Sequence, residues 1–279
     1  MKNRLNNAVV AITGAGSGIG RALALACANQ GAKLAISDIN ADALQSTFEA
    51  AKAENSHIEV TQQVLDVSDK QQVSDWAKQT SEHFGVVNVI INNAGVAVSS
   101  SVESIEYADF EWLMNINFWG VVYGSKSFLP YLQQASWGHI VNISSLFGLI
   151  STPNSSAYNA AKFAVRGFSE SLRIELMMSN EHITVSCVHP GGIKTNIANS
   201  AREGKGFLGV ASRMSTLERK QQFNDKMARL TPDQAAEIII KGMLRKKGKI
   251  LVGTDAKWLD RLQRLMPVGY QKIVKRVFR

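Results

Sequence analysis

The sequence has few of the residues that cross-link a chain or bind a metal. Only two cysteines, Cys27 and Cys187, occur in 279 residues, and each lies in an apolar stretch. This excludes a disulfide-stabilised scaffold and predicts buried free thiols, as in a reducing cytoplasm. The five histidines show no metal-ligand spacing, so we expect no metal site.

Long apolar runs are also missing. None reaches the 18 residues of a membrane span, so we expect no transmembrane helix. The first residues, "MKNRLNNAVVAITG", have a short basic lead without a small-residue cleavage pattern, and we interpret them as the first strand rather than a signal peptide. With 45% apolar and 19% charged residues, the composition predicts a globular cytoplasmic protein.

Acidic residues are scarce at one end of the chain only. Residues 241–279 hold twelve Lys or Arg against two Asp or Glu, a balance of +10, whereas the other 240 residues have a balance of −2. The net charge of +8 is therefore a property of the C-terminal segment. This argues against a protein built around nucleic acid.

Short apolar runs alternate with amphipathic stretches along the chain, which predicts a doubly wound, Rossmann-like α/β domain. We expect one domain over residues 1–253, with a seven-stranded, mostly parallel sheet, helices on both faces, and ligands beyond the carboxyl ends of the strands. The expected strands are 8–13, 33–38, 58–67, 87–93, 138–145, 183–190 and 249–253. The expected helices lie near 18–30, 40–54, 69–84, 106–134, 156–179 and 232–246.

One long stretch, about 194–230, interrupts this alternation. It follows a strand end, holds three glycines, and carries the apolar residues Phe207, Leu208 and Val210. Long irregular insertions in compact domains are usually lids or binding loops. We interpret this stretch as a substrate lid, with a plain surface excursion as the alternative.

The glycine-rich turn "TGAGSGIG" (13–20) follows the first strand and precedes a helix, an arrangement that binds phosphate. It matches neither G-x-G-x-x-G nor the Walker pattern. Asp38 ends the second strand, eighteen residues past Gly20, where an acid accepts hydrogen bonds from a ribose 2′-hydroxyl and repels a 2′-phosphate. The glycine-rich turn and Asp38 together favour NAD over NADP as the cofactor, although Asp38 could instead cap the next helix.

A second constellation is "YNAAK", which places Tyr158 and Lys162 on one face of a helix. A phenol with a pKa near 10 is a poor acid or base at neutral pH, and we expect Lys162 to lower the pKa of Tyr158. Upstream, "NISS" ends a strand, where a hydroxyl could polarise a carbonyl oxygen.

Together these motifs resemble the short-chain dehydrogenase/reductase family over residues 6 to about 253. The turn is similar to T-G-x-x-x-G-x-G, with Gly16 as a tolerated extra glycine, and "LDV" (65–67), "NNAG" (92–95), "NINFWG" (115–120) and "HPGGIKT" (189–195) follow in the family order. The catalytic Ser lies thirteen residues before the Tyr in the family, which selects Ser145 over Ser144. By this resemblance the catalytic residues are Asn117, Ser145, Tyr158 and Lys162. The cofactor-binding residues are Gly14, Ser17, Gly18, Ile19, Gly20, Asp38, Asp66, Val67, Asn93, Ala94, Gly95, Tyr158, Lys162, Pro190, Gly191, Ile193 and Thr195.

The resemblance also implies a mechanism. Tyr158 exchanges a proton with an alcohol or carbonyl, and Ser145 hydrogen-bonds the substrate oxygen. Lys162 binds the nicotinamide ribose, Asn117 holds a water that links Lys162 to solvent, and Ile193 and Thr195 hold the carboxamide. Family members are commonly dimers or tetramers through the helices at 106–134 and 156–179, and we expect a homo-oligomer here.

The segment 254–279 lies outside these motifs. Its pattern predicts two short amphipathic helices with basic polar faces. Three interpretations stay open: docking on the parent fold or a neighbouring subunit, forming a wall of an apolar substrate pocket, and peripheral contact with an anionic membrane surface.

Apolar residues after Ser145, among them Leu146, Phe147, Leu149 and Ile150, favour a substrate with a hydrophobic body. The leading hypothesis is an NAD-dependent enzyme that interconverts an alcohol with a ketone or aldehyde. The alternatives are a 3-oxoacyl-thioester reductase of lipid synthesis that uses NADPH, and a non-catalytic, cofactor-sensing homologue.

Overall fold

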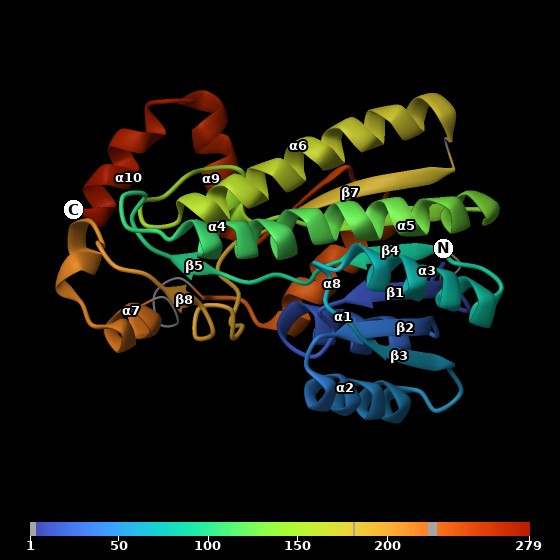
Figure 1. Ribbon diagram of the computed structural model, residues 1–279. Helices are drawn as coiled ribbons and strands as arrows, with labels where there is room; N and C mark the ends of the chain where they lie inside the picture. The colour runs from blue at the N-terminus through green and yellow to red at the C-terminus, as the bar shows by residue number, and fades with distance from the viewer. Residues whose placement is uncertain (1–3, 181, 223–227) are drawn as a thin grey trace.

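A seven-stranded parallel sheet with helices on both faces forms the body of the protein, as the sequence predicts (Figure 1). The computed structural model describes residues 4–180, 182–222 and 228–279. The strand order is β3-β2-β1-β4-β6-β7-β9. These strands are β1 (Val9–Thr13), β2 (Lys33–Asp38), β3 (Val60–Val64), β4 (Val89–Asn92), β6 (Gly138–Ile143), β7 (Ile183–Pro190) and β9 (Lys249–Val252).

The alternation of side chains along β1 shows how the sheet is covered. Val10 and Ile12 pack into a core with residues of α1, α2 and α8, whereas Val9 and Ala11 pack into a core with α3, α5 and α6. Strands buried on both faces need apolar residues at every position, and all five residues of β1 are buried. The helices are α1 (Gly18–Asn29), α2 (Ala41–Glu54), α3 (Lys70–Phe84), α4 (Tyr107–Met114), α5 (Gly120–Gln134), α6 (Ser156–Ser179), α7 (Thr216–Gln222), α8 (Pro232–Leu244), α9 (Thr254–Leu265) and α10 (Tyr270–Phe278).

The structure differs from the expected elements in two places. The continuous helix expected over 106–134 is α4 and α5 joined by a π-helical turn at Asn115–Trp119, a local widening that often marks functional sites. The expected lid contains β8 (Arg202–Glu203), which pairs in parallel with β5 (Val98–Ser99), and α7. Residues 223–227 of that stretch lie outside the described residues.

Candidate active site

The expected site residues gather at one edge of the sheet, where the parallel strands end. Register pairs Asn92 at the end of β4 with Asn142, and Ile143 at the end of β6 with Val188 of β7. The segments that follow β1, β4, β6 and β7 are the glycine-rich turn, "NAG", "SS" and "GGIKT". The carboxyl edge of a doubly wound sheet is the usual ligand site.

The glycine-rich turn is fastened to the segment after β4 by hydrogen bonds. Thr13 Oγ1 accepts from the backbone N–H groups of Asn93 and Ala94, at 2.9 and 3.1 Å. Asn93 Nδ2 donates to the carbonyl oxygens of Thr13 and Gly14, each at 3.0 Å. A Cβ on Gly20 would lie 2.0 Å from the Gly14 carbonyl oxygen, so only glycine lets α1 begin this close to the turn.

The amino end of α1 provides donors for a phosphate. Ser17, the N-cap residue, makes no side-chain capping bond, so the first N–H groups of the helix stay available to a ligand. Gly18 lies directly opposite Thr195, because a Cβ there would be 3.2 Å from Thr195 Cγ2. The turn after β1 and the loop after β7 therefore face each other, as the prediction of a shared cofactor site requires.

Gly16 contacts Asp38 through its backbone, and the tolerance of this extra glycine stays a prediction. Its N–H donates to Asp38 Oδ2 at 2.8 Å, and a Cβ there would lie 2.9 Å from the same oxygen. Asp38 Oδ1 accepts from Asn40 N at 2.9 Å. Asn40, and not Asp38, caps α2 by accepting from Ala43 N. The carboxylate of Asp38 is thus held rigidly beside the turn.

The structure distinguishes the two serines after β6. Ser144 is 2% exposed, and its hydroxyl donates to the Lys162 carbonyl oxygen at 2.8 Å. Ser145 Oγ accepts from Phe147 N at 3.1 Å and also hydrogen-bonds Tyr158. The bond from Phe147 uses one lone pair of the Ser145 oxygen and leaves its single proton available for Tyr158 or a substrate oxygen.

Tyr158 lies half-buried on the first turn of α6, with its ring edge-on to Phe147 at 5.9 Å between ring centres. Burial raises the pKa of its hydroxyl to about 12, and the hydrogen bond with Ser145 works in the opposite direction. The expected lowering of this pKa by Lys162 is wrong for this structure, because burial outweighs every other influence. The hydroxyl is therefore neutral at pH 7.

Lys162 is almost completely buried at 2% exposure, and Nζ donates to the Ile143 carbonyl oxygen at 3.0 Å. Burial lowers its pKa to about 8, so the ammonium form still predominates at pH 7. Nζ lies 5.6 Å from the centre of the Tyr158 ring. One of its three protons is used by Ile143, which leaves two for a ligand.

Asn117 is fully buried in the π-helical turn and stays bound to its own protein. Its Oδ1 accepts from Val96 N and its Nδ2 donates to Val96 O, each at 2.8 Å. This pair fixes the segment after β4 next to Lys162, since Gly95 lies between the two side chains. The water that would link Lys162 to solvent stays a prediction.

Asp66 and Val67 lie on the loop between β3 and α3. Asp66 Oδ1 accepts from the N–H and the hydroxyl of Ser68, both at 2.8 Å. The N–H of Leu65 donates to the Asp38 carbonyl oxygen at 3.1 Å. The loop that carries the expected cofactor-binding residues Asp66 and Val67 is thus connected to the strand end that carries Asp38.

Comparison with known proteins agrees with this geometry. Residues 8–206 match the short chain dehydrogenase family. A Mycobacterium tuberculosis protein named as an oxidoreductase, SadH, is 44% identical over 95% of this chain and 93% of its own length. This chain belongs to the short-chain dehydrogenase family.

Two further family members show its breadth. A Burkholderia phymatum short-chain dehydrogenase/reductase, solved in complex with NAD, superposes with a TM-score of 0.84 at 30% identity and covers 93% of this chain and 94% of its own. The mouse 3-ketodihydrosphingosine reductase is 32% identical over 92% of this chain and 75% of its own length. As a member of the family, the protein is an oxidoreductase that acts with NAD(P).

One supporting residue of this dehydrogenase, Asp255, was missed by the sequence reasoning. Asp255 Oδ2 accepts from Gly192 N at 2.8 Å, in the loop after β7 that contains Pro190, Gly191 and Ile193. A Cβ on Gly191 would lie 2.1 Å from that carboxylate. The sequence signal that could identify Asp255 is an acidic residue shortly after the end of β9, in the segment interpreted as a C-terminal extension.

Replacing Asp255 with Ala should weaken NADH binding about tenfold, because the loop loses a charge-assisted hydrogen bond worth roughly 1.5–3 kcal/mol. Fluorescence titration with NADH measures the dissociation constant. Asp255→Asn keeps an acceptor oxygen, so its dissociation constant for NADH should lie between those of the wild type and Asp255→Ala. Asp233→Ala, on the first turn of α8, serves as the control. An unchanged affinity in Asp255→Ala would show that the loop holds its shape without this carboxylate.

His189 supports the catalytic serine from the neighbouring strand. It is fully buried, and burial lowers the pKa of its imidazole to about 4, so the ring is neutral at pH 7. Nδ1 lies 2.9 Å from the Ser145 carbonyl oxygen, which requires the proton on Nδ1. This contact fixes the backbone of Ser145 at the end of β6.

The C-terminal helices cover the segment that follows Ser145. Leu146, Ile150 and Tyr270 form a small buried cluster with Phe147, Leu259, Leu262 and Val274 packed against it. Tyr270 Oη accepts from Ser151 N at 3.0 Å. The segment 254–279 therefore docks on the parent fold beside Ser145, as the first of its three interpretations expects, and the pocket wall and the membrane contact stay predictions.

The lid is joined to the segment before Tyr158 and to the C-terminal end. Asn154 exchanges two hydrogen bonds with the backbone of Leu208, at 2.9 and 3.0 Å. Gly209 lies against the Phe278 carbonyl oxygen. Leu208 and Val210 remain 59% and 40% exposed, and the role of this segment as a substrate lid stays a prediction.

Proposed function

We propose that this dehydrogenase uses NAD to interconvert an alcohol that has a hydrophobic body with its ketone or aldehyde. The observation that carries the proposal is the position of Tyr158: its hydroxyl hydrogen-bonds Ser145, and the centre of its ring lies 5.6 Å from the buried ammonium of Lys162, at the strand edge where the glycine-rich turn also lies. When bound, the nicotinamide supplies the hydride chemistry.

The residues of the chain account for the proton chemistry. Tyr158 Oη gives a proton to the carbonyl oxygen in the reducing direction and takes it back in the oxidising direction. Ser145 donates its free proton to the same oxygen as charge develops there. Lys162 places a positive charge beside the phenol and has two protons left for ribose hydroxyls.

The preference for NAD rests on Asp38. Its carboxylate is fixed by Gly16 and Asn40 at the end of β2, where a 2′-hydroxyl donates to it and a 2′-phosphate is repelled. The nearest basic residue of α1, Arg21, is engaged with Ser46 and Thr47 of α2.

Replacing Asp38 with Asn should lower the preference for NAD over NADP roughly 100-fold. The variant no longer places a carboxylate beside the 2′-phosphate of NADP, and like charges this close cost several kcal/mol. The ratio of kcat/KM for the two cofactors measures the preference. Asp75→Asn on α3, whose carboxylate accepts from Gln71, is the matched control. A wild type that prefers NADP would favour the thioester reductase of lipid synthesis instead.

The hydrophobic substrate body is supported by the wall after Ser145. Phe147 contacts Tyr158 edge-on, and it packs against Leu146 and Ile150, which are buried under the C-terminal helices. The mouse relative is named for reducing 3-ketodihydrosphingosine, which agrees with a long apolar substrate. The presence of all four catalytic residues argues against a non-catalytic homologue.

A further inference from the structure

The C-terminal helices carry large apolar side chains that the fold leaves uncovered. Trp258, Leu265, Met266 and Val268 are 58%, 82%, 43% and 71% exposed. Single exposed apolar residues are ordinary, but these four occur within eleven residues of sequence. We call them the tail tip.

The exposure of α9 is one-sided. Ala256 and Asp260 are buried against the parent fold. Trp258, Arg261 and Leu265 have spacings of i, i+3 and i+7, which place them on one helix face, and all three are exposed. The apolar residues of the tail tip on α9 therefore share a stripe with a basic residue, on the side turned away from the body.

Basic residues surround the tail tip, and free carboxylates are missing from it. The two acids of 254–279 are both engaged: Asp255 accepts from Gly192 N, and Asp260 is paired with Lys249 and Arg264. The exposed basic residues of this segment are Lys257, Arg261, Arg264, Lys272, Lys275, Arg276 and Arg279.

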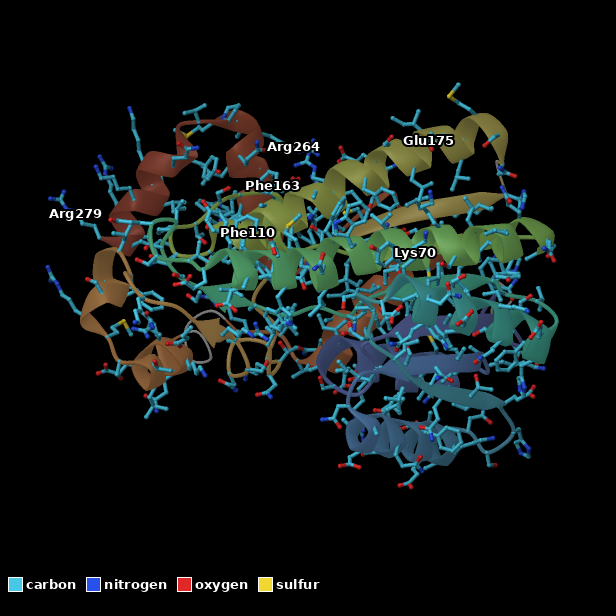
Figure 2. All side chains as sticks on the ribbon, viewed as in Figure 1. Lys70, Phe110, Phe163, Glu175, Arg264 and Arg279 are labelled. Carbon is cyan, nitrogen blue, oxygen red and sulfur yellow. The ribbon has the colours of Figure 1, made fainter. Side chains whose placement is uncertain are left out.

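This surface has a fixed orientation. Tyr270 is buried and bonded to Ser151 N, and Val274 packs on the cluster around Leu146. Figure 1 shows α9 and α10 along the outer edge of the molecule, away from α2 and β3. In Figure 2, Arg264 and Arg279 both lie at this edge, and Glu175 of α6 lies at the opposite end.

We infer that the tail tip and its basic rim bind the surface of an anionic lipid bilayer. An apolar centre enters the boundary between headgroups and acyl chains, and the surrounding Lys and Arg attract the lipid phosphates. A second copy of the chain fits less well, because the same seven cations would meet across the contact. The binding is peripheral, since among the described residues no helix is long and apolar enough to cross a bilayer.

Vesicle co-sedimentation of the full chain tests the inference. The probes are vesicles of phosphatidylcholine alone and vesicles that contain about a quarter phosphatidylglycerol. One variant, Leu265→Asp with Val268→Asp, removes the apolar centre. A second, Lys272→Gln with Lys275→Gln and Arg276→Gln, removes three charges of the rim. Val86→Asp is the control, because Val86 is exposed between α3 and β4, outside the helices expected to form an oligomer interface.

The wild type and Val86→Asp should sediment with anionic vesicles at low salt and much less with neutral ones. Each basic residue near the surface contributes roughly fivefold in affinity, so the triple variant should bind on the order of 100-fold more weakly. The Asp variant should also lose binding. Dehydrogenase activity on a water-soluble alcohol should persist in all variants, which separates this surface from the proposed function.

Three outcomes would overturn the inference: absence of sedimentation with anionic vesicles at low salt, equal binding of wild type and triple variant, or a dimer that Leu265→Asp abolishes without any vesicle binding. The last result would assign the surface to a second copy of the chain.

Discussion

Replacing Tyr158 with Phe lowers kcat about a thousandfold or more, because the substrate oxygen loses its proton donor and acceptor. The change removes one hydroxyl and keeps the ring that packs edge-on against Phe147. NADH should therefore bind with unchanged affinity. Initial rates at saturating cofactor, together with a fluorescence titration of NADH, measure both quantities.

The control is Tyr131→Phe, a partly buried tyrosine near the carboxyl end of α5 that packs with the core of α3, α5 and α6; it should leave kcat unchanged. If Tyr158→Phe kept more than about a tenth of the wild-type kcat, the proton would pass through another group, and the assignment of Tyr158 would be wrong.

Replacing Lys162 with Met has a comparably large effect on turnover but a different kinetic pattern. The variant loses both the charge beside Tyr158 and the two protons available to ribose hydroxyls. We expect kcat to fall by roughly a thousandfold and the NADH dissociation constant to rise by about tenfold or more. Tyr158→Phe should change only the first of these.

The same variant should not lose stability at pH 7. Burial lowers the pKa of Lys162 from 10.5 to about 8, which corresponds to a cost of about 3 kcal/mol for holding the charged form in the folded protein. Below pH 8 the lysine is protonated in both folded and unfolded states, so this cost is present in full. It disappears as pH rises from about 8 to 10.5, where the folded protein binds fewer protons than the unfolded chain.

Urea unfolding at pH 7 and pH 9.5 checks the direction in which the free energy of unfolding changes with pH. The wild type should gain stability between the two pH values relative to Lys162→Met, and at pH 7 the variant should be at least as stable as the wild type. A clearly destabilised variant at pH 7 would show that the hydrogen bond to Ile143 outweighs the cost of burial.

The sequence predicted the sheet because its strands follow local patterns, and the catalytic roles assigned from motif spacing stay predictions that the two variants above test. Apolar runs such as residues 8–13 gave the strands, and the motif spacing selected Ser145, which the engagement of Ser144 with Lys162 explains physically. These features need no knowledge of contacts between distant residues.

Other features depend on contacts between segments far apart in the chain. The role of Gly16 follows from its bond to Asp38, and that of Asp255 from its bond to Gly192, 63 residues away. The pKa of Tyr158 follows from burial that the Tyr-x-x-x-Lys spacing does not show. The periodicity of apolar residues does not predict the π-helical turn at Asn117.

The measurement that tests the central claim most directly is cofactor reduction by the full chain, followed at 340 nm, across secondary alcohols graded by chain length. With NAD the rate should be substantial and should rise with chain length, and with NADP it should be much lower. Finding no reduction of either cofactor by any alcohol, and no oxidation of NADH by the matching ketones, in a protein that binds NADH, would contradict the account.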